Sequence, residues 1–110
     1  MEYAAAILAS AHEHIQKVFE TDEILAYHNP DELQRGVEKM VLYLLRKDLG
    51  RLLHILYRID VDERQVKQAM RAASEEEVAA HLSHLIIKRE LQRAQTRFIY
   101  SRDNIKNRIS

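Results

Sequence analysis

Cysteine is absent from this sequence of 110 residues, and only two glycines and one proline occur in it. Without cysteine the chain has no disulfide, no thiolate metal ligand and no cysteine nucleophile, which fits a reducing cytoplasm. Sheets joined by tight turns need many more glycines and prolines, whereas long helices with few corners do not. We therefore predict an all-α protein, a compact bundle of four to five helices.

Long apolar runs are also missing, and none approaches the roughly 18 residues that a membrane span requires. The first basic residue is Lys17, so the start of the chain lacks the positive charge of a secretory signal. Hydrophobic residues make up 46% of the chain and charged residues 31%, which is too apolar for intrinsic disorder. We expect a soluble, cytoplasmic protein that has no membrane partner.

The charges are unevenly distributed, although they sum to zero. Residues 1–34 contain seven acids and one base, whereas residues 84–110 contain seven bases and two acids. This asymmetry favours docking of the two ends, within one chain or between two, and leaves open a basic surface for an acidic partner. We expect one helical domain over residues 1–100, followed by a polar, basic tail over residues 101–110 that frays.

Helix-start signals and apolar spacing divide the chain into five predicted helices. Asn29 before Pro30 is a favourable N-cap followed by a favourable first helical residue. Residues 21–23 break the first helix or only add charge to it, and residues 24–27 form a short turn. A continuous helix over residues 30–58, with Gly50 as its weak point, is an alternative. The predicted helices cover residues 2–20, 30–46, 49–58, 61–73 and 74–100.

The stretch from Asp48 to Glu63 is the centre of the predicted architecture. Asp60 and Glu63 have the spacing of a capping box, so we expect a new helix to start from Asp60. The string Leu-Tyr-Arg-Ile-Asp-Val at residues 56–61 resembles one carried by a family of small, all-helical, uncharacterised bacterial proteins. The similarity would cover residues 33–97, and it implies the helical fold but no activity or substrate. The apolar residues before the corner recur at three- and four-residue intervals, as on one face of a helix: Leu52, Leu53, Leu56 and Ile59.

Two of the predicted helices carry apolar surface that a protein partner could bind. The first helix has a seam that either covers its own core or forms a dimer, made of Ala4, Leu8, Ala11, Ile15 and Val18. The last helix starts at a capping box, Ser74 with Glu77, and is apolar on two sides. Such a helix is either central to its own bundle or held by a partner. We predict a non-enzymatic protein–protein interaction module, a homodimer or the ligand of another protein, with a contact stripe of Ala80, Ile87, Leu91, Ala94 and Phe98.

The alternative function is DNA binding by a helix-turn-helix whose recognition helix is residues 61–73. Its outward-facing side chains would be Arg64, Gln65, Lys67, Gln68 and Arg71. Arginine and glutamine read guanine and adenine edges in the major groove. Acidic neighbours and zero net charge count against this alternative, because affinity for nucleic acid comes mostly from neutralised phosphates. On the last helix Arg89, Arg93 and Arg97 are four residues apart, and are solvated, paired or bound to phosphate nonspecifically.

Patterns typical of catalysis or metal binding are few. His81 and His84 lie three residues apart, a spacing that can begin a metal site, but a third and fourth ligand do not follow. Two isolated glycines cannot form a phosphate-cradling loop, and no serine occupies a nucleophile elbow. We therefore predict no enzyme, no catalytic or metal-binding residue and no cofactor; metal-dependent activity around His81 and His84 is the minor alternative.

Overall fold

The computed structural model describes the backbone of residues 2–20 and 29–109 and the side chains of residues 4–20 and 29–100. The described residues form five helices, which confirms the predicted all-α bundle: α1 (Glu2–Phe19), α2 (Pro30–Lys47), α3 (Leu49–Ile59), α4 (Glu63–Ala69) and α5 (Glu75–Ile109). The break at 21–23 and the turn at 24–27 lie outside the described residues. For the predicted tail, only the backbone is described, and it is helical to Ile109.

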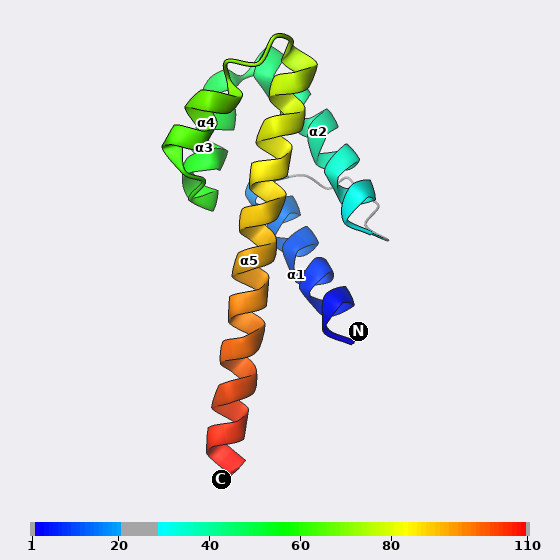
Figure 1. Ribbon diagram of the computed structural model, residues 1–110, viewed down its shortest axis with the longest axis vertical. Helices are drawn as coiled ribbons and strands as arrows, with labels where there is room; N and C mark the ends of the chain where they lie inside the picture. The colour runs from blue at the N-terminus through cyan, green and yellow to red at the C-terminus, as the bar shows by residue number, and fades with distance from the viewer. Residues whose placement is uncertain (1, 21–28, 110) are drawn as a thin grey trace.

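The 35-residue helix α5 is the axis of the molecule, and each of the other four helices packs against it. In the view of Figure 1, α1 and α2 lie to one side of α5, and α3 and α4 to the other. The molecule is elongated along α5, with extents of 54 × 28 × 23 Å. Among the described residues, no helix is both long enough and apolar enough to cross a membrane.

Apart from Phe19 the core is aliphatic, and it receives side chains from all five helices. Leu56, which the apolar spacing places in the core, is 3% exposed. Ala11, Ile15 and Val18 of α1 are also buried within the chain, so the first-helix seam covers the core of its own molecule. The fully buried aliphatic side chains, with no exposed surface, are Ala11, Ile15, Leu33, Val37, Val41, Leu52, Ile59, Leu82 and Ile86.

Two residues with short polar side chains, Asn29 and Asp48, flank α2. Asn29 caps the helix as predicted, because its Oδ1 accepts the N–H of Glu32 at 2.9 Å. The helix ends at Asp48, whose N–H donates to the carbonyl of Leu44 at 2.7 Å. The side chain of Asp48 then accepts the N–H of Arg51 at 3.1 Å and starts α3. The long helix over residues 30–58 is therefore broken at Asp48 and not at Gly50, since an aspartate cap satisfies backbone groups of both helices.

The corner between α3 and α4 differs from the prediction. Asp60 does not start α4; it ends α3 in the left-handed conformation, with φ of 66°. The N-cap of α4 is Asp62, whose Oδ1 accepts the N–H of Arg64 at 2.9 Å. The side chains of Asp60 and Asp62 could each cap a helix. Because Asp60 adopts the left-handed conformation, which aspartate tolerates, the helix starts after Asp62 instead. The helix also ends early, at Ala69 rather than residue 73.

The N-terminus of α5 has the predicted cap and an additional tie to α2. The Oγ of Ser74 accepts the N–H of Glu77 at 3.2 Å. Arg46 donates to Glu75 and to Glu76, at 2.9 Å each. The hydrogen bond to Glu75, together with the charges of both carboxylates, raises the pKa of Arg46. The acidic first turn of α5 thus offsets the helix dipole and also pairs with the basic last turn of α2.

Candidate functional site

Much of the predicted contact stripe on α5 is buried within the chain itself. Ile87 and Ala94 are 6% and 2% exposed, and Ile87 belongs to the core cluster. Ala80, Leu91 and Phe98 are half-buried. Because α1 and the other helices pack around α5, its second apolar face serves mainly the intramolecular core. A helix that is apolar on two sides is either central to its own bundle or held by a partner, and α5 is the central helix of its bundle.

The five predicted nucleic-acid contacts are all exposed. Four of them, Arg64, Gln65, Lys67 and Gln68, lie on α4, whereas Arg71 follows the end of that helix. With seven residues, α4 has about two turns, which is short for a helix that must lie along a major groove. The exposed carboxylates at positions 60, 62 and 63 precede these side chains, where they would repel phosphate.

A cavity of about 470 Å³ between α4 and α5 brings together two sets of residues that were predicted separately. It is lined by Gln65, Gln68 and Arg71 from the α4 side and by His81 and His84 from α5. Neither a carboxylate nor a cysteine is among its lining residues. Within the described part of the chain, no three histidine, aspartate or glutamate side chains form a group that could hold a metal ion.

Three of the large apolar side chains that are exposed in the described part of the chain lie on the outer face of α3. Leu49, Leu53 and Tyr57 are 42%, 46% and 83% exposed and follow one another at four-residue intervals. The prediction that Leu53 shares the inward face with Leu52 and Leu56 is therefore wrong. Consecutive residues lie about 100° apart on a helix, so the face centred on Leu52 and Leu56 leaves Leu53 at its margin. We call Leu49, Leu53 and Tyr57 the α3 stripe.

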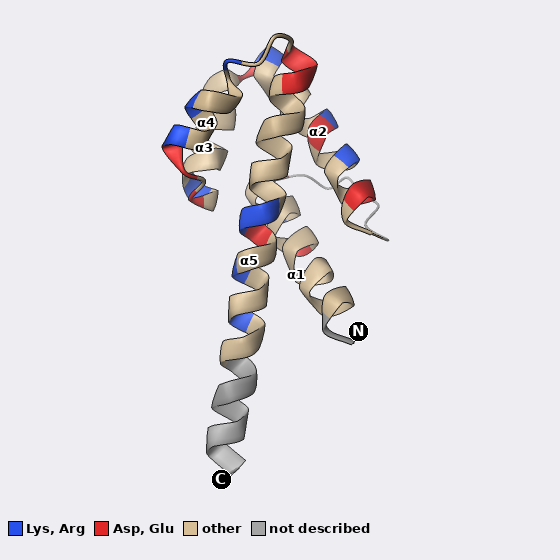
Figure 2. Cartoon of the chain, viewed as in Figure 1, with Lys and Arg blue, Asp and Glu red and all other residues tan. Residues whose placement is uncertain are grey.

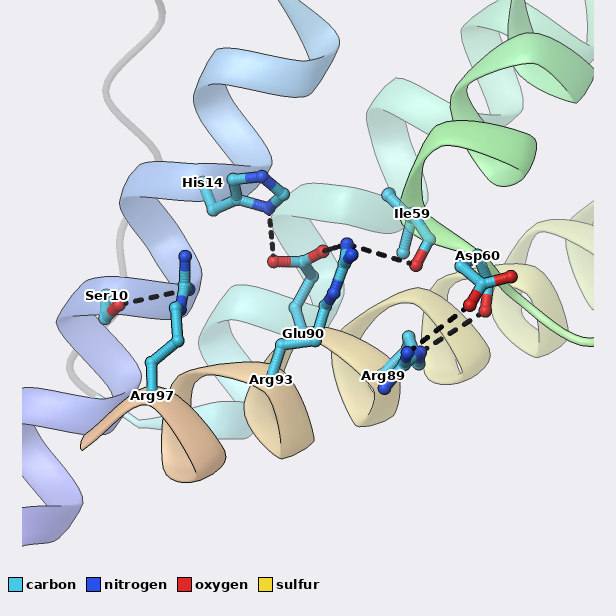
Figure 3. A network of polar contacts seen from close by, with 8 residues as sticks. All are labelled: Ser10, His14, Ile59, Asp60, Arg89, Glu90, Arg93 and Arg97. Atoms are coloured by element: carbon cyan, nitrogen blue, oxygen red, sulfur yellow. Dashed lines mark hydrogen bonds and ion pairs between the residues drawn. The ribbon is translucent and has the colours of Figure 1, made fainter. Parts of the chain in front are cut away.

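A carboxyl side chain lies inside the bundle where α1 meets α5. Glu90 of α5 has no exposed surface, and its Oε2 lies 2.6 Å from Nδ1 of His14 on α1. Its second oxygen, Oε1, lies 4.0 Å from Nη1 of Arg93 and has no hydrogen bond to a described residue. Figure 3 shows Glu90 between these two side chains. A buried carboxylate is costly unless opposite charge and hydrogen bonds compensate for the lost water, and His14 and Arg93 supply both.

Basic residues follow one another along α5 (Figure 2), and Figure 3 shows three of them in succession, Arg89, Arg93 and Arg97. Arg89 donates to the carbonyl and the carboxylate of Asp60, at 3.3 and 3.4 Å. Arg93 donates to the carbonyl of Ile59 at 3.4 Å, and Arg97 donates to Ser10 Oγ at 3.4 Å. A cavity of about 440 Å³ lies among these side chains, and we call it the arginine cavity; it is lined by His14, Arg89, Arg93, Thr96 and Arg97.

The pairing of His14 with Glu90 was not predicted, because the two residues are 76 positions apart and neither belongs to a recognisable motif. The contact joins a histidine from the acidic start of the chain to a glutamate from its basic end. This is the reverse of the pairing that the charge asymmetry suggests. The four-residue spacing of Arg89, Arg93 and Arg97 was the one available signal for the arginine cavity.

No family model, curated protein or solved structure matches the chain. The resemblance of residues 56–61 to a bacterial family therefore stays a prediction.

Proposed function

We propose that the chain is a non-enzymatic interaction module that self-associates through the α3 stripe. The observation that carries this proposal is the exposure of three large apolar side chains in a row on one helix, Leu49, Leu53 and Tyr57. Single exposed apolar residues are normal on a soluble protein, but a contiguous apolar face is typical of a contact surface.

A second copy of the chain is the partner that best complements this face. In an antiparallel pair of α3 helices related by a two-fold axis, Leu53 contacts its own counterpart. Leu49 then lies beside Tyr57 of the other copy, and this contact occurs twice.

Gly50 allows the two helices to approach closely. It lies one turn before Leu53, and a side chain at this position would meet only Asp48 Oδ1, at 3.8 Å. The backbone of α3 is therefore open to a neighbour at this point. The helix has 11 residues and is about 16 Å long, so the interface is small. We expect a weak, reversible dimer with a Kd on the order of micromolar or weaker.

Sedimentation equilibrium over a range of protein concentrations tests the proposal. Leu53→Glu introduces two carboxylates at the centre of the interface and should yield a monomer at all concentrations. Because Leu53 is 46% exposed, the variant should keep its helical circular dichroism spectrum. Ile99→Glu is the matched control, since Ile99 is a 51% exposed apolar residue of α5 and is not part of the α3 stripe.

The two variants separate the possible results. Loss of the dimer in Leu53→Glu alone supports the α3 stripe. Loss in Ile99→Glu alone would overturn it and return the interface to α5, near the predicted contact residue Phe98. A wild-type protein that is monomeric at every concentration would reject self-association.

DNA binding through α4 remains the second candidate, and the exposure of all five predicted contact residues supports it. Replacing Arg64 and Gln68 together by alanine should abolish DNA binding without changing the fold, because both side chains point to solvent. Gel-shift titration of the wild type and the double variant at low and high salt tests this candidate. Equal affinity of the two proteins would remove it.

A further inference from the structure

We propose that the arginine cavity between α1 and α5 binds a phosphate-type oxyanion, such as the diphosphate group of a small molecule. This site is independent of the α3 stripe and of α4. Its lining side chains are three guanidinium groups, one imidazole and one hydroxyl, all of them able to donate hydrogen bonds. Arginine in particular presents paired N–H groups that match two oxygens of a phosphate.

The guanidinium groups retain donors for a ligand. Each guanidinium has five N–H groups. Towards described residues, Arg89 uses two of them in hydrogen bonds, and Arg93 and Arg97 use one each. These bonds are 3.3–3.4 Å long, which is longer than usual for N–H···O hydrogen bonds, so they are weak. Bonds to a charged oxyanion are shorter and about twice as strong, so an anion in the cavity can compete for these groups.

Glu90 gives the cavity a buried support. Its carboxylate, which has no exposed surface, holds His14 at 2.6 Å on one side and lies 4.0 Å from Arg93 on the other. An apolar residue at this place would stabilise the bundle at least as well, because buried ion pairs seldom exceed the cost of their desolvation. The pair does fix two cavity-lining side chains from different helices relative to each other. A binding site requires its contact residues to be held in place by such supporting side chains.

The charge and size of the cavity indicate the class of ligand. Among the described residues, the three arginines pair with only two carboxylates, Asp60 and Glu90, and Asp60 is exposed enough to be screened by water. From Arg89 to Arg97 the helix rises about 12 Å, which exceeds the length of a single phosphate. A cavity of about 440 Å³ has the volume of a small-molecule pocket. Two linked phosphoryl groups meet these conditions better than one carboxylate does.

Calorimetric titration of the full chain with inorganic pyrophosphate, at constant ionic strength, tests the proposal. We expect saturable binding with one site per chain. Arg97→Gln should weaken it about tenfold or more, because one charge-assisted pair of hydrogen bonds is lost. Arg35→Gln is the matched control; Arg35 is an exposed arginine of α2, so this variant loses the same charge but leaves the cavity intact. It should bind within about twofold of the wild type.

A second measurement does not depend on any variant. In ¹H–¹⁵N spectra of the wild type, pyrophosphate should shift the amide of Thr96 and the Nε–Hε signals of the lining arginines. Signals of α4 should not move. No saturable binding at millimolar pyrophosphate would overturn the proposal, and so would equal weakening in Arg97→Gln and Arg35→Gln, which would indicate general attraction to charge. Displacement of pyrophosphate by a short single-stranded oligonucleotide, but not by a nucleoside diphosphate, would also reject a small-molecule ligand.

Discussion

The environment of Glu90 makes His14 a structural residue as well as a wall of the arginine cavity. Glu90 is fully buried, whereas the side chain of His14 is 28% exposed, so water can reach only one member of the pair. Removing His14 should therefore affect stability differently from removing Glu90. A carboxylate that remains in the core loses its main hydrogen bond, whereas an imidazole at the surface can bind water instead.

This asymmetry gives a prediction for single substitutions. His14→Ala leaves the buried carboxylate with only the distant Arg93 as compensation, and should lower the free energy of unfolding by about 3 kcal/mol. Glu90→Leu removes the buried carboxylate, fills its space with an apolar side chain and lets His14 bind water, so it should leave the free energy of unfolding unchanged or raise it by about 1 kcal/mol. Urea denaturation monitored by circular dichroism at neutral pH measures both values. Equal losses in the two variants would contradict the unequal solvent access on which the prediction depends.

At the level of the helices, the sequence predicted the helix starts that depend only on nearby residues. It did not predict which residue ends α3 and which one starts α4. Asn29 and Ser74 cap α2 and α5 as predicted, because a cap is decided within three residues of sequence. Asp60 and Asp62 offer equivalent side chains, so local spacing cannot choose between them. The choice depends on contacts that are distant in sequence: Arg89 of α5 binds the carbonyl and carboxylate of Asp60.

The two aspartates of the corner should respond differently to substitution. Asp62→Ala removes the N-cap of α4 and should lower the free energy of unfolding by about 1 kcal/mol. Asp60→Gly removes a side chain from a left-handed residue, where glycine is unstrained, and should be neutral or stabilising by up to about 1 kcal/mol. Thermal and urea unfolding of both variants check the assignment. A loss in Asp60→Gly that exceeds the loss in Asp62→Ala would mean that Arg89 depends on the carboxylate of Asp60.

For the whole molecule, periodicity predicted how many helices form but not which of their faces meet. The two apolar sides of α5 were visible in the sequence, yet whether Ile87 and Ala94 meet α1 or a second chain depends on how the helices pair. The same limit applies to the candidate sites. The four-residue spacing of the arginines was readable, whereas the cavity beside them exists only because α1 brings His14 to Glu90. The α3 stripe likewise became visible only when the inward face of α3 was known.

Self-association of the folded chain should also appear in its stability. If the native state dimerises and the unfolded state does not, mass action makes the thermal midpoint rise with protein concentration. We expect the midpoint of the wild type to rise by a few degrees for each tenfold increase in concentration above the Kd. Differential scanning calorimetry over a concentration series measures this slope.

The α3-stripe variant Leu53→Glu and its control Ile99→Glu show whether that slope comes from the proposed dimer. Leu53→Glu should unfold at one temperature whatever its concentration, because it no longer forms the dimer. Ile99→Glu should keep the slope of the wild type. At the lowest concentration all three proteins are monomers, and their midpoints should converge, since both substituted positions are about half exposed and lie outside the core. A large difference at that limit would show that Leu53 stabilises its own chain, and a flat wild-type series would contradict dimerisation.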